Sequence, residues 1–401
     1  MKKNVLCFLT MAITFGATAQ EVVQWRYDRT GNYPEKGLLN AWGEDGPQLL
    51  WHYDGLGEGH SSVAVSVAGK LYVTGMTDGK GWIYAFSPDG KLLNKKEYGD
   101  EWSKSYNGTR GTVTPDKDKL YFISGMGEVF CLKENDLSLV WKKSFMNDFG
   151  GENITWGICE SPLIVEDKVI VSPGRSNNIV ALNKNTGEVV WTCEGEGDLS
   201  AYCSPIYIAD LPVPQIVTHM QKYIVGIEAA TGKKLWSYEH VNQHGVHPNV
   251  ALYADNQLFI TSGYGKGSVM LQLKDGGKSV EKLWEEPQLD SRIGATVKIG
   301  DYIYGSGDKN RFWFCLDWKT GEIKYKDNTL GTGDVIAADG KLYCYSERGE
   351  LALVNVNPEK FDLVSRFPVT LGTDQHWAHP VIYQGVLYLH HGNTLMAYKV
   401  K

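Results

Sequence analysis

The sequence predicts an all-β protein in which small sheets form a closed ring, and three observations support this class. A hairpin pattern returns along the chain roughly every 40 to 50 residues, the spacing of propeller blades made of four strands. The 45 glycines, 13 tryptophans and 22 tyrosines suit short aromatic strands joined by tight turns. No long segment repeats apolar residues at the helical period, so helices are not expected to form the core.

The hairpin is clearest in residues 179–191, IVALNKNTGEVVW. Apolar residues from Ile179 onward predict a strand, Thr186 and Gly187 predict the turn, and the segment ending at Trp191 predicts the second strand. The same unit returns at residues 224–236, 313–325 and, without Thr-Gly, 129–141.

Seven complete repeats are predicted, each with an innermost strand, a second apolar strand and this hairpin. They span residues 60–98, 107–143, 155–193, 199–238, 244–285, 290–326 and 331–367. An eighth repeat, residues 376–401, ends one strand short, and Leu49, Leu50 and Trp51 are expected to supply its missing outer strand. We therefore expect eight blades in a ring without a long open edge.

The N-terminus has the composition of a secretory signal. Lys2 and Lys3 precede an apolar run that ends in Ala17-Thr18-Ala19, which predicts a signal peptide over residues 1–19 and one propeller domain over residues 20–401. No other apolar run reaches the roughly 18 residues of a membrane helix. We expect an exported monomer, periplasmic or extracellular.

The net charge bears on the binding partner, and the cysteine positions bear on the redox state of the chain. The formal net charge is −7, so nucleic acid is not an expected partner. Cys131 and Cys315 occupy the repeat position of Ala181 and are expected to be buried structural thiols. Cys159 and Cys203 hold equivalent places in neighbouring repeats, where a disulfide or two free thiols are both open.

The repeated motif A-L-x-x-x-T-G-x-x-x-W, at residues 181–191, 226–236 and 315–325, resembles that of quinoprotein-type eight-bladed propellers. The segments around Trp25-Arg26, Thr109-Arg110 and Trp377-Ala378-His379-Pro380 resemble the secreted PQQ-repeat-like proteins labelled polyvinyl-alcohol dehydrogenase-like. The resemblance implies either a dehydrogenase that holds pyrroloquinoline quinone (PQQ) with Ca²⁺ on the axis, or a non-catalytic envelope-assembly scaffold. This chain has no adjacent cysteine pair, which the dehydrogenases usually place beneath the quinone.

A propeller's central channel is the usual place for function, because the loops before the innermost strands meet there. Polar and aromatic residues gather just before those strands. We predict a ligand site formed by His60, Arg110, Trp156, Glu160, Tyr202, His247, Arg292, Asp334, His376 and His379. The alternative is that each of these side chains only satisfies the backbone of a neighbouring blade.

Three of these residues, Asp334, Glu160 and His247, are the candidate catalytic bases, with Arg110 or Arg292 stabilising an anion. In a dehydrogenase Asp334 would take the alcohol proton and Trp156 would stack on the quinone. In a glycan lyase or hydrolase a histidine and Tyr202 would act as base and acid. The sequence identifies no metal site.

The function expected first is a binding propeller without catalysis, which presents a site for a small molecule, a glycan or a protein. A PQQ-dependent dehydrogenase, a carbohydrate-active lyase or hydrolase, and an envelope-assembly scaffold remain alternatives. His390 and His391 are expected outside this site, with one imidazole pointing inward and one outward on a strand.

Overall fold

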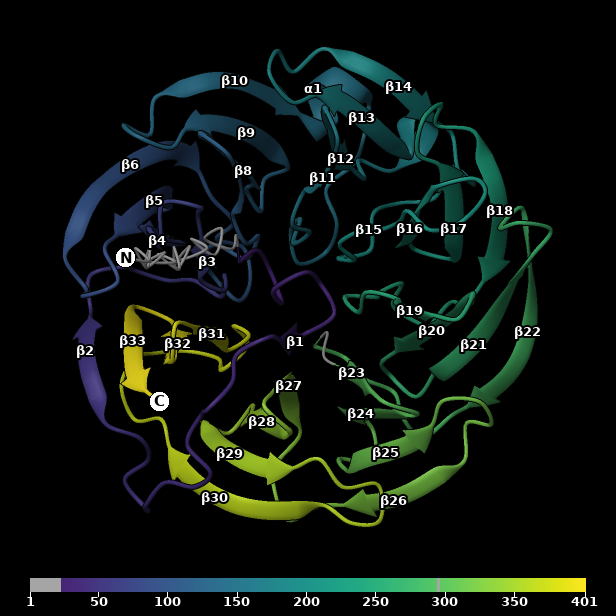
Figure 1. Ribbon diagram of the computed structural model, residues 1–401. Coiled ribbons are helices and arrows are strands. Elements are labelled where there is room, and N and C mark those ends of the chain that lie inside the picture. The colour runs from purple at the N-terminus through teal and green to yellow at the C-terminus, as the bar shows by residue number, and fades with distance from the viewer. Residues whose placement is uncertain (1–22, 294–295) are drawn as a thin grey trace, which may run out of the picture.

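The computed structural model describes residues 23–293 and 296–401, and in them eight sheets surround a central axis (Figure 1). The predicted all-β class and the eight blades are confirmed. Helical structure in the described residues is limited to α1 (Phe145–Phe149) and the short 3-10 helix η1 (Arg175–Asn177). The predicted signal peptide, residues 1–19, lies outside the described residues.

Each blade is an antiparallel sheet whose strands run from the axis to the rim in chain order. The first four blades are β3–β6 (Ala64–Val65, Leu71–Thr77, Lys80–Phe86, Leu92–Asp100), β7–β10 (Thr114–Asp116, Lys119–Ile123, Glu128–Lys133, Leu139–Ser144), β11–β14 (Leu163–Val165, Lys168–Val171, Ile179–Asn183, Val189–Cys193) and β15–β18 (Ile206–Ile208, Gln215–His219, Tyr223–Glu228, Lys234–Glu239). The last four are β19–β22 (Leu252–Ala254, Gln257–Ser262, Gly267–Lys274, Ser279–Glu286), β23–β26 (Thr296–Ile299, Tyr302–Ser306, Trp313–Asp317, Ile323–Asp327), β27–β30 (Gly333–Ala338, Lys341–Ser346, Glu350–Asn355, Asp362–Pro368) and β31–β33 (Val381–Tyr383, Val386–His391, Thr394–Lys399).

The ring closes as the sequence predicts. Strand β2 (Leu49–Tyr53) pairs antiparallel with β33, with Trp51 opposite Ala397, and so completes the eighth blade. A second contact was not predicted: β1 (Asn32–Tyr33) pairs in parallel with β27, at the inner edge of the seventh blade. The N-terminal segment therefore crosses from the axis to the rim before the first blade begins (Figure 1).

The Thr-Gly turn and the closing tryptophan of the repeat meet between neighbouring blades. The Trp141 indole at the end of one blade donates from Nε1 to the Lys184 carbonyl at 3.0 Å, in the hairpin turn of the next. It also packs on Gly187, where a Cβ would lie 2.8 Å from the indole. Trp191 with Gly232, Trp284 with Gly321 and Trp51 with Gly90 repeat the contact. Glycine is required because the turn has a positive φ and the indole occupies the space of a side chain.

The middle strands of each blade are covered on both faces by the blades beside them. The His390 and His391 side chains, adjacent on β32, are accordingly both buried, at 1% and 6% exposure. The prediction that one of them points outward is wrong, because alternation exposes a side chain only where one face of the sheet meets water. Cys131 and Cys315 are fully buried, as predicted.

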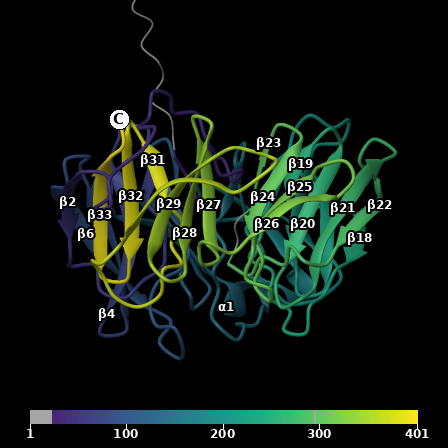
Figure 2. The ribbon, with the colours of Figure 1, turned by 90° about the horizontal axis from the view of Figure 1, so that it is seen from below.

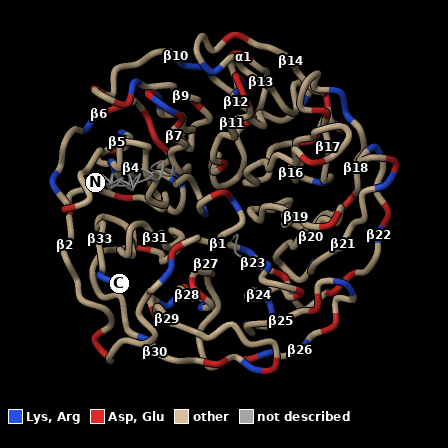
Figure 3. Tube along the Cα trace, viewed as in Figure 1, with Lys and Arg blue, Asp and Glu red and all other residues tan. Residues whose placement is uncertain are grey.

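Seen from the side, the blades stand next to one another around the ring (Figure 2). Lysine, arginine, aspartate and glutamate follow the outer strands and the loops of the rim (Figure 3). Within the described part of the chain, no helix is long and apolar enough to cross a membrane.

Candidate functional site

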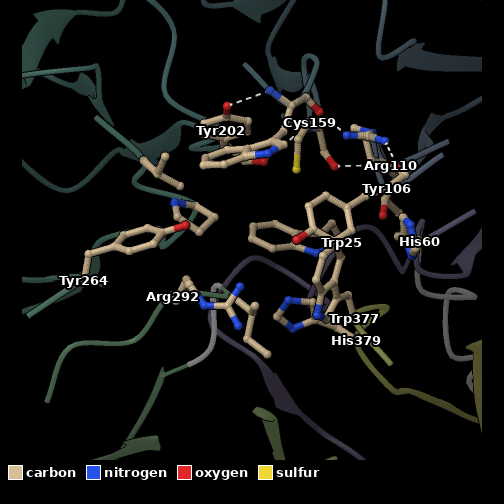
Figure 4. A pocket seen from close by; sticks show the side chains of 17 residues that line it. Trp25, His60, Tyr106, Arg110, Cys159, Tyr202, Tyr264, Arg292, Trp377 and His379 are labelled. Atoms are coloured by element: carbon tan, nitrogen blue, oxygen red, sulfur yellow. Dashed lines mark hydrogen bonds between the residues drawn. The ribbon is translucent and has the colours of Figure 1, made fainter. Parts of the chain in front are cut away.

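A cavity of about 190 Å³ lies on the axis, where the segments before the innermost strands converge (Figure 4). Six of the seventeen lining residues are tryptophan or tyrosine, and the wall also holds two arginines and two histidines. The lining residues are Trp25, His60, Tyr106, Arg110, Thr112, Trp156, Cys159, Ser161, Tyr202, Ser204, Val246, Pro248, Tyr264, Arg292, Ile293, Trp377 and His379.

Six of the ten predicted site residues line this cavity, namely His60, Arg110, Trp156, Tyr202, Arg292 and His379. Glu160, His247, Asp334 and His376 do not. The difference follows the alternation of side chains along extended backbone. Cys159 and Ser161 line the cavity while Glu160 between them faces away, and Val246 and Pro248 likewise flank His247.

Hydroxyl groups hold the lining segments of adjacent blades at a fixed spacing. The His379 amide donates to Ser62 Oγ at 3.0 Å, and the Ser62 amide donates to Thr112 Oγ1 at 2.9 Å. The Thr112 amide donates to Ser161 Oγ at 3.2 Å, and the Ser161 amide to Ser204 Oγ at 2.9 Å. We call Ser62, Thr112, Ser161 and Ser204 the hydroxyl ladder. It links the eighth blade through the first three to the fourth and so fixes one half of the cavity wall.

His60 and Arg110 are brought together by the backbone. The His60 amide donates to the Thr109 carbonyl at 2.7 Å, in a bridge between the first two blades, so the next residue along, Arg110, lies beside the imidazole. Neither ring nitrogen of His60 makes a hydrogen bond of normal geometry, although the side chain is only 9% exposed, and a weaker interaction with the Asn107 backbone raises its pKa slightly. Burial, and then the nearby Arg110 charge, lower the His60 pKa to about 3. The imidazole is therefore neutral at physiological pH.

The Arg110 guanidinium is held by backbone carbonyls. It donates to Gly108 at 3.3 and 3.1 Å, to Tyr106 at 2.5 Å, and to Trp156. No carboxylate of the described residues forms an ion pair with it, and burial lowers its pKa. Arg110 is thus a partly buried cation without an ion pair, although the buried Glu101 carboxyl is near enough to raise its pKa and its guanidinium lies 5.8 Å from the centroid of the Trp102 ring.

Arg292 lies across the cavity from Arg110 (Figure 4) and has the opposite electrostatic setting. Its Nε donates to Asp308 at 3.0 Å, and its Nη2 donates to both oxygens of Glu347, at 2.7 and 2.9 Å. These two carboxylates lie outside the cavity lining and neutralise the guanidinium. Arg292 is therefore a fixed wall group whose charge is already compensated.

The N-terminal segment supplies one wall of the cavity, which the repeat pattern did not predict. Trp25 contacts His379 edge to face, with ring centroids 5.2 Å apart. The next residue, Arg26, is fully buried and donates to the carbonyls of Val335 at 3.0 Å and Thr296 at 2.6 Å. Arg26, Tyr27 and Arg29 all have positive φ, so this segment coils tightly instead of forming a strand.

The four predicted residues outside the lining have their own partners or lie fully buried. His247 bonds Ser262 Oγ at 2.8 Å and the Gln221 carbonyl at 3.0 Å, and His376 bonds the Tyr345 hydroxyl at 2.5 Å. Glu160 accepts from the Ser172 amide at 2.7 Å, and burial raises its pKa to about 7. Neither carboxyl oxygen of Asp334 accepts a hydrogen bond, and burial raises its pKa well above the usual range.

His379 lines the cavity and also contacts the buried carboxyl group of Asp334. Its Nδ1 faces Arg26 Nη1 at 3.1 Å, and its Nε2 lies 3.5 Å from Asp334 Oδ1. Both ring nitrogens of His379 therefore face Arg26 and Asp334, which lie outside the cavity lining. Burial lowers the His379 pKa well below its usual value. Of the two histidines in the wall, His60 is the one with nitrogens left for a ligand.

The sequence relationship agrees with the fold. A family model described as outer membrane protein assembly factor BamB matches residues 148–360, more than half of the 401 residues. The chain belongs to this family. No curated protein matches the BamB-family chain.

Solved structures similar to this BamB-family chain share its fold at low identity. BamB from Moraxella catarrhalis aligns with a TM-score of 0.65 and 14% identity, over 88% of this chain and 99% of that one. Quinohemoprotein alcohol dehydrogenase from Comamonas testosteroni aligns with a TM-score of 0.67 and 13% identity, over 94% and 80%. A europium-containing methanol dehydrogenase aligns with a TM-score of 0.64 and 13% identity, over 92% and 90%.

The residues of this BamB-family cavity do not fit a calcium-bound quinone. Calcium binds six to eight oxygens, usually including carboxylates. The described lining contains no aspartate or glutamate. Over residues 23–293 and 296–401, no group of three or more His, Cys, Asp or Glu side chains is placed to hold a metal ion. The donor set favours an anion over a cation.

Both cysteines near the cavity are thiols in this BamB-family structure. Cys159 lines the cavity, and burial raises its pKa to about 11. Cys203 is buried, and its Sγ lies 3.2 Å from the Asn249 carbonyl as a hydrogen-bond donor. A thiol with a raised pKa is a weak nucleophile, which gives Cys159 the role of a wall residue.

Proposed function

We propose that this BamB-family chain is an exported binding propeller whose axial cavity takes a small organic ligand without transforming it. The observation that carries the proposal is His60, a buried side chain that lines the cavity and has two unpartnered nitrogens. Buried polar atoms are almost always hydrogen-bonded, so these nitrogens call for a partner that enters the cavity. The aromatic wall supplies apolar contact area for the same ligand.

A binding role is preferred to catalysis because the candidate bases are turned away. Glu160, His247 and Asp334 lie outside the cavity lining, and a general base must come within hydrogen-bond reach of the proton it takes. Cys159 lines the cavity but has a raised pKa. The wall binds and orients a ligand, and no carboxyl group of the described lining faces that ligand. A histidine and Tyr202, the pair expected of a lyase or hydrolase, do line the cavity, but burial lowers the His60 pKa to about 3, which makes its imidazole a weak base.

A cavity-filling variant tests the proposal. Cys159→Phe places a ring in the cavity, whereas Val364→Phe adds the same ring at a position on β30 that is 36% exposed. Both proteins are screened by thermal shift against a small-molecule library beside the natural protein. We expect ligands that stabilise the natural protein and Val364→Phe but not Cys159→Phe. A library without any such ligand, or one whose ligands still stabilise Cys159→Phe, contradicts the proposal.

Export is the second part of the proposal and has its own test. The predicted cleavage after Ala19 should yield a protein that begins at Gln20. N-terminal sequencing of protein recovered from the periplasm or medium checks this. Recovery only from the cytoplasm, with Met1 retained, would count against export.

An envelope scaffold is the second candidate function, and the family match favours it. In this role the rim or the loops would bind a protein, and the cavity would be incidental. Affinity capture from detergent-solubilised membranes, with Cys159→Phe as bait beside the natural protein, separates the two functions. The scaffold requires a partner that both baits capture equally.

A further inference from the structure

We propose that the axial cavity selects a single-ring aromatic carboxylate and holds it without a metal ion, with the carboxylate against His60 and Arg110 and the ring between aromatic walls. This inference rests on the proposed function, because it names the class of ligand for that cavity. The size of the cavity, the chemistry of its wall, the distribution of charge and the free hydrogen-bonding capacity each bear on it.

The volume matches a ligand of about one ring. A dry cavity of roughly 150 Å³ accommodates benzene, so about 190 Å³ leaves room for one ring and a small substituent. A fused three-ring quinone with several carboxylates is larger than this space. The volume alone also admits a monosaccharide, which the chemistry of the wall disfavours.

Aromatic groups from several blades surround the cavity. Trp377 contacts both Tyr106 and His60, with ring centroids 4.9 and 5.2 Å apart. Trp156 and Tyr202 face each other at 6.1 Å on another side. Figure 4 shows Trp25 at the centre of the view, between these groups. Aromatic surfaces around a narrow space favour a flat ring that makes stacked and edge contacts.

The described lining lacks the carboxylate and amide side chains that bind sugar hydroxyls. It contains no aspartate, glutamate, asparagine or glutamine. Three of its hydroxyls, on Thr112, Ser161 and Ser204, already accept backbone hydrogen bonds of the hydroxyl ladder. A sugar has a hydroxyl on most of its carbons, and each buried hydroxyl without a partner weakens binding. An aromatic ring requires none of these partners.

The two arginines differ in their partners, and this difference determines where the negatively charged group of the ligand binds. Arg292 is neutralised by Asp308 and Glu347, whereas Arg110 forms no ion pair and donates hydrogen bonds only to backbone carbonyls. The buried Glu101 carboxyl lies near enough to raise the Arg110 pKa, but it accepts its own hydrogen bonds from Tyr98, Trp102 and Gly125. A partly buried cation without a directly paired carboxylate favours an anionic ligand, since each charge offsets the desolvation of the other. The carboxylate is therefore placed on the Arg110 side of the cavity.

His60 supplies the hydrogen-bonding groups on the Arg110 side of the cavity. A neutral imidazole has one N–H donor and one acceptor nitrogen, and both nitrogens of His60 are without partners. The N–H can donate to one carboxylate oxygen while Arg110 supplies the charge beside it. A phenyl ring that carries an uncharged alcohol in place of the carboxylate loses the charge interaction and keeps the apolar contacts.

The test is a calorimetric titration of the purified protein with four probes, each in EDTA and again in Ca²⁺. The probes are benzoate, benzyl alcohol as its uncharged analogue, glucuronate as an anionic sugar, and PQQ. We expect saturable benzoate binding that is equal in EDTA and Ca²⁺, and at least roughly tenfold weaker binding of benzyl alcohol. Glucuronate and PQQ should bind more weakly than benzoate in both buffers.

The variant His60→Leu separates the hydrogen bond from the ring contacts. We expect it to weaken benzoate by roughly tenfold and to leave benzyl alcohol within about twofold. His52→Leu, a change at a surface histidine whose side chain is 42% exposed, is the matched control and should change neither. If His60→Leu does not fold, the preference for benzoate over benzyl alcohol in the natural protein still decides the question.

The titrations distinguish failure of this inference from failure of the proposed ligand-binding function. Equal binding of benzyl alcohol, tighter binding of glucuronate, or binding that requires Ca²⁺ overturns this inference and leaves a ligand-binding cavity. If none of the four probes binds, the single-ring carboxylate is overturned, and the thermal-shift screen with Cys159→Phe then decides separately whether the cavity binds ligands of another class.

Discussion

The hydroxyl ladder shows how single residues position the site. Ser161 uses its amide and its hydroxyl in opposite directions: the amide donates to Ser204 in the next blade, and the hydroxyl accepts from Thr112 in the previous one. The Ser161 side chain is buried, at 2% exposure. Ser161, like Thr112 and Ser204, therefore contributes to the spacing between blades as well as to the cavity wall.

Removing this hydroxyl should destabilise the protein. Ser161→Ala leaves the buried Thr112 amide without an acceptor, which costs about 1 to 3 kcal/mol of unfolding free energy. Ser291→Ala is the matched control, because the Ser291 side chain is buried at 1% exposure and its hydroxyl has no partner. Urea denaturation of both variants measures the difference. Equal stabilities would show that the ladder does not stabilise the ring.

Several site residues could be predicted from the sequence because they follow the repeat. Arg110, Trp156 and Tyr202 precede innermost strands and line the cavity as expected. Glu160 and His247 were placed there by the same rule, but each lies one residue out of register with the wall. An offset of one residue along extended backbone reverses the side chain, and a pattern read over whole repeats does not resolve that offset.

At the scale of the element, the Thr-Gly hairpin explains why the repeat has a glycine in its turn and a tryptophan at its end. The glycine accepts the indole of the preceding blade, and the tryptophan at the end of the hairpin packs on the turn of the following one. The motif therefore encodes contacts between blades as well as the hairpin, which is why several copies in register predicted the ring.

A pair of glycines tests this contact. In Gly187→Ala the new Cβ would lie 2.8 Å from the Trp141 ring at a φ of +73°, whereas at Gly340 the φ is +74° and nothing lies within 4 Å. Both changes introduce left-handed strain of roughly 1 kcal/mol. Gly187→Ala should lose about 1 to 3 kcal/mol more, because the indole must move. Thermal unfolding of both variants gives the difference, and equal losses would contradict the role of the indole.

The position of the first part of the N-terminal segment could not be predicted from the sequence repeat. Its outer part, β2, belongs to the repeat and was predicted, whereas Trp25 and Arg26 lie in a coil with positive φ values that has no repeat partner. Their position depends on contacts with Val335, Thr296 and His379, far away in the sequence. Such contacts leave no local signal, so this wall of the cavity appeared only in the structure.

At the scale of the whole molecule, many ionisable side chains are buried in uncharged forms. Burial lowers the pKa of His60 and His247 to about 3 and that of His240 and His376 to about 4. Two stacked pairs, His219 with His247 and His376 with His391, have ring centroids 3.7 Å apart. Charging either pair would place like charges in contact within a buried layer.

These shifts predict how stability depends on pH. The unfolded histidines titrate near 6.5, above their folded pKa values, so the unfolded state binds more protons and stability falls as the pH drops from 6.5 towards 4. Glu160 acts in the other direction: its folded pKa of about 7 exceeds the unfolded value, so its contribution is lost as the pH rises from about 4.5 through 7.

Burial also raises the pKa of other carboxyls of the described chain, so six act in this direction: Glu101, Glu160, Asp198, Asp290, Asp334 and Glu347. Seven histidines have lowered pKa values, so the net loss should lie on the acid side and should be modest. Urea denaturation between pH 4 and pH 8 measures the loss, and stability should decrease below pH 6.5. A protein that is as stable at pH 4.5 as at pH 7 would show that these histidines are not held neutral.

The central claim is that the axial cavity is a ligand site and not only a gap left by the ring. The most direct measurement is a crystal structure of the protein soaked with benzoate in EDTA. We predict density for the ring among Trp25, Trp156 and Trp377, with a carboxylate oxygen within hydrogen-bond distance of a His60 ring nitrogen and beside Arg110. Benzoate bound on the rim, or a cavity filled only with water at saturating benzoate, would contradict the account.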